Sequence, residues 1–234
     1  MRKKITLIIL VKNEITGIRE IMPKVQLDLF DEVAVVDGGS TDGSREYFNH
    51  AGIRVITQTK PGRGEAFREA FANTSGDALI FFSPDGNENP ADLDKFRPFL
   101  EMNTALVIGT RMACGGVNEE DGNFFKFRKW ANNFFSLIAN IFFNRHQSFV
   151  TDTINGFRAI TRDAWNTLSP DGPGYTIEYQ TSIRAMKKGM TILEFPTAEG
   201  QRCDLREGSP SIQTGLAFIK IFFKELRKGC KSGN

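Results

Sequence analysis

Four polar clusters in the N-terminal part of the sequence each follow a short apolar run. They are KNE at residues 12–14, DGGS at 37–40, KPGRG at 60–64 and SPDGN at 83–87. The KPGRG cluster combines cations with backbone N–H groups at the expected start of a helix, which suits a phosphate group. Each cluster alone is also typical of turns and helix caps, but four of them at strand ends favour a ligand site.

The sequence lacks two common nucleotide-binding patterns. Residues 60–64 do not match the GxxxxGK[ST] sequence of a P-loop, and no GxGxxG sequence follows the first apolar run. The clusters therefore predict an anion site without the fingerprint of a dinucleotide-binding fold.

Apolar runs and helical spacing alternate along the same part of the chain. We expect strands at Ile5–Val11, Glu32–Val36, Arg54–Thr57 and Ala78–Phe82, and helices at Glu14–Val25, Ser44–His50, Gly64–Asn73 and from near Ala91. This alternation predicts a Rossmann-like α/β fold with a mostly parallel sheet flanked by helices. Ligands of such sheets bind beyond the carboxyl ends of the strands, so the four clusters would line one rim.

Composition excludes several classes of protein. The 234 residues are 40% hydrophobic and 25% charged, as in a soluble globular domain, and the net charge of +2 argues against a nucleic-acid partner. Three cysteines without metal-like spacing fit a reducing, cytoplasmic compartment better than a disulfide framework. No apolar run reaches the roughly 18 residues of a membrane span.

Six segments occur in an order that resembles a known family. They are IILVKNE, VAVVDGGSTDGS, KPGRGEAFREAF, DALIFFSPDGNENP, VIGTRMACGG and TINGFRAI. Together they resemble family 2 of the glycosyltransferases with the GT-A fold, and most closely its polyprenyl-phosphate (dolichol-phosphate) mannosyl- and glucosyltransferase branch. The resemblance implies a GT-A domain over residues 1–210 that transfers a sugar from a nucleoside diphosphate sugar, usually with inversion.

The resemblance also implies a nucleotide site. Matching the family's motifs assigns nucleotide binding to Lys12, Glu14, Asp37, Ser40 and Arg63. Gly38 stands where the family has the second Asp of a pair, and Leu10 replaces a usual proline. These departures leave the base of the donor open.

SPDGNENP matches the family's DxD metal motif. Asp85 is its second carboxylate and Asn87 the later polar ligand, whereas Ser83 replaces the first Asp. A Mg²⁺ or Mn²⁺ ion held there would neutralise the diphosphate and stabilise the leaving group. Because Ser83 lacks a carboxylate, metal-independent transfer remains an alternative.

The remaining motifs imply catalytic groups besides Asp85. Arg111 matches an arginine that binds pyrophosphate or an acceptor phosphate bidentately, and Arg202 would close over the diphosphate. Asp152 would be a general base if the acceptor is a hydroxyl, whereas an ionised lipid phosphate needs no strong base. Arg128 and Ser209 are the expected contacts to the acceptor.

Two segments are amphipathic. Within Phe124–Arg145, a polar stripe at i, i+4 spacing comprises Arg128, Asn132, Ser136 and Asn140. Either the phenylalanines of this helix belong to the core, or the stripe faces the acceptor and the phenylalanines contact lipid. Residues 211–234 form a basic amphipathic helix and tail that would bind a membrane surface, the protein's own core or a second subunit of a homodimer.

The sequence thus predicts an inverting glycosyltransferase that acts on a polyprenyl phosphate or another membrane-associated acceptor. Two alternatives remain open. One is a glycosyltransferase with a soluble acceptor, and the other is a non-catalytic protein that binds nucleotide sugars. The predicted location is the cytoplasm, with peripheral attachment to the membrane as a further expectation.

Overall fold

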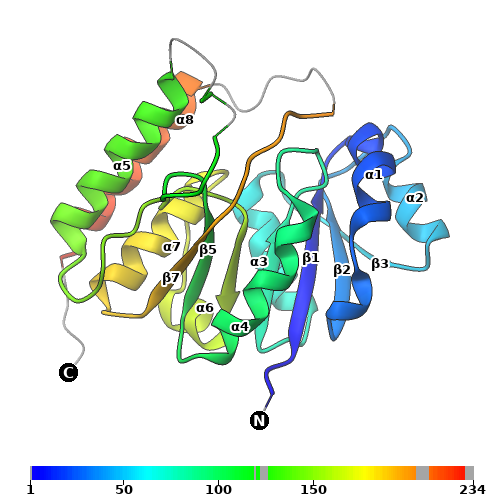
Figure 1. Ribbon diagram of the computed structural model, residues 1–234, viewed down its shortest axis with the longest axis horizontal. Coiled ribbons are helices and arrows are strands. Elements are labelled where there is room, and N and C mark those ends of the chain that lie inside the picture. Colours follow the sequence, from blue (N-terminus) through cyan, green and yellow to red (C-terminus); the bar gives the residue numbers. More distant parts are fainter. Residues whose placement is uncertain (1, 119, 122–125, 204–210, 230–234) are drawn as a thin grey trace.

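The computed structural model describes residues 2–118, 120–121, 126–203 and 211–229. Within these ranges one sheet has the strand order β3-β2-β1-β4-β6-β5-β7 (Figure 1). Its strands are β1 Ile5–Val11, β2 Glu32–Asp37, β3 Arg54–Thr57, β4 Ala78–Phe82, β5 Leu106–Thr110, β6 Arg158–Thr161 and β7 Ile192–Pro196. All neighbours pair in parallel except β6, which is antiparallel to β4 and β5. The predicted mostly parallel α/β fold is confirmed.

The helices largely follow the predicted pattern. They are α1 Ile15–Ile21, α2 Ser44–His50, α3 Arg63–Asn73, α4 Phe96–Glu101, α5 Phe127–Phe143, α6 Arg162–Leu168, α7 Thr176–Lys187 and α8 Ser211–Arg227, with 3₁₀ turns η1 Met22–Lys24, η2 Leu27–Leu29 and η3 Pro90–Lys95. The helix expected to reach Val25 ends as an α-helix at Ile21, because Pro23 lacks the N–H that would continue it. The helix expected near Ala91 begins as a 3₁₀ turn whose Asn89 side chain accepts a hydrogen bond from Ala91 N at 3.1 Å.

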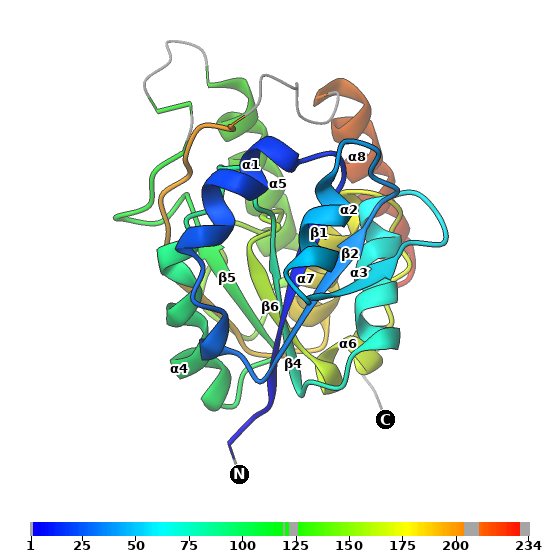
Figure 2. The same ribbon diagram turned by 90° about the vertical axis from the view of Figure 1, so that its right-hand side faces the viewer.

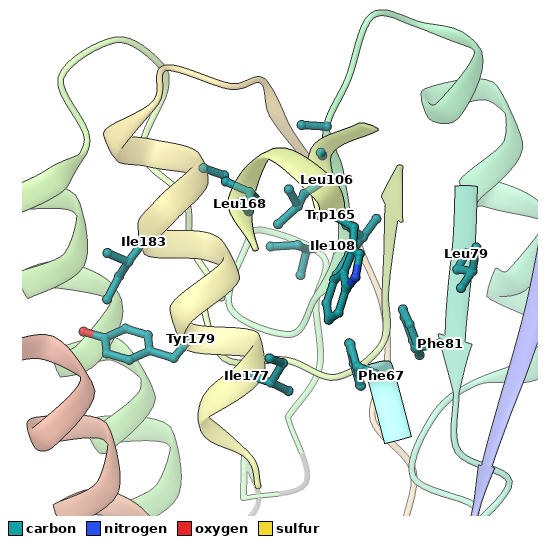
Figure 3. Packing of buried hydrophobic residues seen from close by; sticks show 14 of the residues in the cluster. Phe67, Leu79, Phe81, Leu106, Ile108, Trp165, Leu168, Ile177, Tyr179 and Ile183 are labelled. Carbon is teal, nitrogen blue, oxygen red and sulfur yellow. The ribbon is translucent and has the colours of Figure 1, made fainter. Parts of the chain in front are cut away.

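Side chains alternate between the two faces of the sheet. On β1, Leu7 and Ile9 face the layer of α1, α2 and α4, whereas Ile8 and Leu10 face the layer that includes α3, α6 and α7. Figure 2 shows α4 on one side of the sheet and α3 and α6 on the other. Figure 3 shows the second layer, where Phe67 stacks on Phe81 with ring centroids 3.7 Å apart. The burial of both faces explains why the strands are almost continuously apolar.

Helices α5 and α8 lie side by side next to α7 (Figure 1). Phe218 of α8 packs edge to face against Phe135 of α5 and Tyr179 of α7, at centroid distances of 5.2 and 5.4 Å. The Tyr179 hydroxyl donates to Phe135 O at 3.1 Å. The C-terminal helix therefore shares the core of the α/β unit, and a domain boundary at residue 210 stays a prediction. Within the described ranges, no helix is both long and apolar enough to cross a membrane.

Helix α5 turns its polar side inward. Asn132, Ser136 and Asn140 are buried, and Asn140 donates to Ser136 O and Val150 O at 2.7 and 2.9 Å. Its exposed large apolar residues are Phe127, Trp130, Phe134, Leu137, Ile141 and Phe142. The polar stripe is therefore buried, and of the phenylalanines of this helix only Phe135 and Phe143 join the described core. That the stripe faces an acceptor and the exposed side chains contact lipid stays a prediction.

Candidate active site

A cavity of about 750 Å³ lies where the loops after β1, β2 and β4 meet α5, α7 and α8. Strand β1 pairs with β2 on one side and β4 on the other, so this is the point at which the strand order reverses. The predicted residues that line the cavity are Lys12, Glu14, Arg63, Asp85, Asn87, Arg111, Arg128 and Arg202. Asp37, Ser40 and Asp152 are not among the lining residues, and Ser209 lies outside the described residues.

Asp37 and Ser40 connect the first two strand-end loops. The buried Asp37 carboxylate accepts a hydrogen bond from Ser40 N at 3.1 Å, and Ser40 Oγ accepts one from Asn13 N at 2.9 Å. Gly38, between them, lines the cavity, and a Cβ there would lie 3.3 Å from Lys12 Cβ. Asp37 and Ser40 therefore shape the wall by joining the two loops, and the glycine leaves room beside Lys12.

Arg63 enters the cavity from the first turn of α3. Its Nε donates to the buried Glu178 carboxylate and its Nη1 to Ser83 Oγ at 3.4 Å. A Cβ on Gly156 would lie only 2.0 Å from Arg63 Nη2, so a larger residue there would displace the guanidinium from its present position. Burial lowers the pKa of Arg63, but the charge of Glu178 outweighs it and raises the pKa, which keeps a fixed cation in the site.

Glu178 is a cavity residue that the sequence did not reveal. It is 1% exposed, it lies in the first turn of α7, and its Oε2 has no hydrogen-bond partner among the described residues. A buried acceptor without a donor costs free energy unless a ligand or water satisfies it. The TIEYQ sequence around Glu178 matches no motif. Only the packing of α7 beside Arg63 brings this carboxylate into the cavity.

Glu88 is a second residue missed from the sequence. Its Oε2 accepts a hydrogen bond from Ser83 N at 2.7 Å, and it lines the cavity together with Asp85. Burial raises the pKa of Glu88 to about 8, helped by the charge of Asp85 and opposed by Arg63 and Arg111. Its place within SPDGNENP was the available signal, because the turn at residues 84–87 folds residue 88 back over residue 83.

Arg111 is held by two carboxylates. It donates from Nε to Asp152 Oδ2 at 2.8 Å, from Nη2 to Asp152 Oδ1 at 3.2 Å and from Nη1 to Glu199 Oε1 at 2.9 Å. Asn132 Nδ2 donates to Asp152 Oδ1 at 2.8 Å. Burial raises the pKa of the fully buried Asp152, but Arg111 and Asn132 outweigh it and the net pKa is lowered. Asp152 is thus an ionised partner that fixes the direction of Arg111.

Oxygen atoms that could bind a metal ion lie at the end of β4. Asp85 is 6% exposed, and its Oδ1 accepts from Asn87 N at 3.0 Å while its Oδ2 lies 3.0 Å from Arg202 Nη2. Among the described residues, no group of three or more His, Cys, Asp or Glu side chains could hold a metal ion. The oxygen ligands at this strand end fit a Mg²⁺ or Mn²⁺ ion that takes its other ligands from a diphosphate. The guanidinium of Arg202 lies against the Asp85 carboxylate, at the position where such an ion would bind.

Comparison with known proteins agrees with this geometry. The family described as Glycosyl transferase family 2 matches residues 6–165. Glycosyltransferase AglJ of Haloferax volcanii is 28% identical over 228 residues, which cover 95% of this chain and 70% of the relative. Polyprenol monophosphomannose synthase of Mycolicibacterium smegmatis is 23% identical over 213 residues, covering 85% of this chain and 76% of the relative.

The fold also matches solved structures. Glucosyl-3-phosphoglycerate synthase of Mycobacterium tuberculosis, in complex with Mn²⁺, UDP-glucose and phosphoglyceric acid, superposes with a TM-score of 0.72 at 23% identity. The match covers 99% of this chain and 81% of that one. The sheet and its flanking helices therefore have the GT-A fold, and because the family match spans more than half of the sequence, the chain is a glycosyltransferase that belongs to glycosyl transferase family 2.

Proposed function

We propose that the protein transfers a sugar from a nucleoside diphosphate sugar to the phosphate of a polyprenyl phosphate, with inversion at the anomeric carbon. The observation that supports this most directly is the composition of the cavity. The strand ends and α3 line it with charged residues such as Lys12, Arg63 and Asp85, and α5 and α8 add the apolar side chains of Phe127, Phe135 and Phe218. An acceptor with an anionic head and an apolar chain suits a cavity with both kinds of lining.

The donor would lie at the strand-end side of the cavity. Lys12 and Glu14 would contact the nucleotide, with Asp37 and Ser40 shaping the loops around it, and Arg63 would face its diphosphate. A divalent ion on Asp85 and Asn87 would offset the charge that develops on the leaving diphosphate. Arg202 would then leave Asp85 and bind a phosphate oxygen, since its side chain is one-third exposed.

The acceptor would be oriented by arginines. Arg111 is held in place by Asp152, and Arg128 lines the cavity from the first turn of α5. Ser209 is a further proposed contact. An oxygen of the acceptor phosphate attacks the anomeric carbon as the bond to the diphosphate breaks, so the nucleoside diphosphate leaves. A phosphate oxygen is already ionised, so we assign Asp152 to positioning Arg111 and not to removing a proton.

The outer surface of α5 and α8 supports a lipid-bound acceptor. The exposed apolar side chains of α8 are Leu216, Ile219, Phe223 and Leu226, beside those already named on α5. The exposed basic residues near them are Lys220, Arg227, Lys228 and Arg145. Aromatic and basic side chains on amphipathic helices favour the surface of an anionic membrane. We propose peripheral attachment to the cytoplasmic face of a membrane through these helices.

The relatives suggest which ligands to test. One relative is named a polyprenol monophosphomannose synthase, and another, from Pyrococcus furiosus, a dolichol-phosphate mannosyltransferase. The glucosyl-3-phosphoglycerate synthase structures contain UDP with Mn²⁺ or Mg²⁺. These names support a nucleotide-sugar donor and a divalent ion, and they offer both a lipid phosphate and a soluble phosphate as acceptors.

The experiment is a transfer assay with labelled UDP-, GDP-, CMP- and dTDP-sugars, with and without Mn²⁺. Polyprenyl phosphate in phospholipid vesicles and 3-phosphoglycerate in solution are offered as parallel acceptors. We expect label in the lipid extract and release of the nucleoside diphosphate. Transfer only to the soluble acceptor would overturn the proposal of a lipid acceptor. Binding of the donor without transfer or hydrolysis would indicate the non-catalytic alternative.

A further inference from the structure

Glu88 lies where the metal motif of this chain lacks a carboxylate. Ser83 occupies the first position of the motif, and its backbone N–H donates to Glu88 Oε2 at 2.7 Å. The turn between them is closed by Asn87 N, which donates to Asp85 Oδ1 at 3.0 Å, and by Gly86, whose φ is +94°. The Glu88 carboxylate is thereby brought back beside Ser83, at the end of β4.

We propose that Glu88 replaces the carboxylate that Ser83 cannot supply, so that Asp85 and Glu88 together bind the divalent ion that accompanies the nucleoside diphosphate. This inference rests on the proposed function and assigns a further ligand to the same site. Mg²⁺ sites in enzymes that act on phosphates commonly use one or two carboxylates, with the remaining ligands from the phosphates and water. With Glu88 the site has two carboxylates, although the motif itself supplies only Asp85.

The surrounding charges support an exchange of partners when substrate binds. Asp85 pairs with Arg202 at 3.0 Å, and the positive charges of Arg63 and Arg111 act on Glu88. A diphosphate would draw Arg202 away from Asp85, while Arg63 and Arg111 stay paired with Glu178 and Asp152. The carboxyl groups of Asp85 and Glu88 would then be left to share one ion. A divalent ion there would neutralise both carboxylates and the phosphates at once.

The cavity also contains an unsatisfied buried group. Glu178 is 1% exposed, and its Oε2 has no hydrogen-bond partner within the described part of the chain, although Glu178 lines the same cavity as Asp85 and Glu88. Its other oxygen accepts from Arg63, which also contacts Ser83. The polar network around Ser83 is therefore incomplete without a ligand, which agrees with a site for substrate and ion and not with a closed structural turn.

The test is Mn²⁺ binding, measured by the electron paramagnetic resonance signal of free Mn²⁺ in the presence of UDP and, in parallel, GDP. Glu88→Gln keeps the volume of the side chain and an acceptor for Ser83 N but cannot ionise to bind a cation. We expect Mn²⁺ affinity to fall by at least about 10- to 100-fold, the loss typical when even an outer-shell partner of a metal ligand is removed. Asp94→Asn, which removes an exposed carboxylate six residues along the chain, is the matched control and should leave affinity unchanged.

A second variant tests the replacement itself. Ser83→Asp combined with Glu88→Gln moves the carboxylate from residue 88 to residue 83, and we expect it to restore most of the affinity that Glu88→Gln loses. If Glu88→Gln binds Mn²⁺ as wild type does while Asp85→Asn does not, Glu88 only stabilises the turn and the inference is overturned. It is also overturned if wild-type protein binds UDP or GDP without any effect of Mn²⁺, whereas failure to bind either nucleotide counts against the proposed function.

Discussion

At the scale of single residues, the cavity pairs its arginines with buried carboxylates. Arg63 contacts Glu178, Arg111 contacts Asp152 and Glu199, and Arg202 contacts Asp85. A buried carboxylate restricts a long, flexible arginine to one direction, at the cost of desolvating both charges. In the proposed function, these pairs would hold the guanidinium groups in position before the phosphates of donor and acceptor bind.

Asp152→Asn separates a positioning role from that of a general base. Asparagine has one oxygen acceptor in place of two, so Arg111 should lose its bidentate contact and turnover should fall by about 10- to 100-fold, as for a misplaced substrate contact. The pH–rate profile should keep its shape, because no proton passes through this group. If the variant instead lost an acid limb present in the wild type, Asp152 would be acting as the base.

At the scale of elements, the sequence predicted the first four strands correctly, because β1, β2 and β4 are almost continuously apolar and β3 has two apolar residues between the exposed Arg54 and Thr57. It gave no signal for β6 and α7. Strand β6 begins with Arg158, which is completely buried, and α7 buries Glu178, Gln180, Thr181 and Ser182 along with its apolar residues. Such elements have weak hydrophobic periodicity. The position of β6 between β4 and β5, antiparallel to both, also cannot be read from an alternating pattern.

Arg158 joins these two elements to the loop before β6. Its guanidinium donates to Asn155 O at 2.6 Å, Glu178 O at 2.9 Å and Thr153 O at 3.1 Å, and also to two hydroxyls of α7. Arg158→Met keeps an extended side chain but removes the Arg158 donor from Asn155 O, whereas Glu178 O and Thr153 O still accept from hydroxyls of α7. We expect the free energy of unfolding in urea to fall by about 1–3 kcal/mol, the cost of one buried group left unsatisfied. A loss below about 0.5 kcal/mol, typical of surface substitutions, would show that Asn155 O finds another partner.

The attachment of α8 should depend on pH. Glu225 is buried between α8 and α7, where Gln180 and Arg184 each donate to it at 2.9 Å. Burial raises the pKa of Glu225, but Arg184 and Gln180 outweigh it and the net pKa is lowered below the ordinary value of 4.5. Its stabilising contribution is therefore complete above that value and is lost as the pH falls through the lower folded-state pKa.

Glu225→Gln should show this dependence directly. At pH 7 we expect the variant to unfold with a free energy about 1–3 kcal/mol lower than wild type, the contribution of hydrogen bonds to a charged group. The difference should shrink as the pH falls below about 4.5, as measured by urea unfolding at each pH. A difference that stays constant down to pH 3 would mean that the pKa of Glu225 is the same in the folded and unfolded states.

At the scale of the whole molecule, the polar and apolar sides of α5 connect the cavity to the surface. On the buried side, Asn132 donates a hydrogen bond to Asp152, while on the other side Trp130, Phe134 and Ile141 are each more than half exposed. The sequence showed the stripe on this helix but not its direction, because an amphipathic pattern defines two faces and only tertiary packing decides which is buried. An outward aromatic face on a helix that also lines the cavity with Phe127 and Phe135 suits the proposed acceptor, which would remain partly in the membrane.

Replacing Trp130, Phe134 and Ile141 together by serine tests this arrangement. Moving each side chain out of a lipid interface should cost about 1.5 kcal/mol or more, so we expect binding to vesicles containing anionic phospholipid to weaken by at least about 100-fold. The fold should be retained, because these side chains are already exposed. Wild-type binding should also decrease as salt screens the basic residues of α8.

Met102→Ser is the matched control, because it removes an apolar side chain that is 54% exposed but lies beyond α4, away from α5 and α8. It should bind vesicles like wild type in the flotation assay. Sedimentation measured in parallel tests the alternative that a second copy of the chain, and not a membrane, covers the aromatic face of α5. If the triple variant floats with vesicles as wild type does but a wild-type dimer becomes a monomer, the aromatic face pairs two copies of the chain, and the acceptor must reach the cavity without membrane contact through α5.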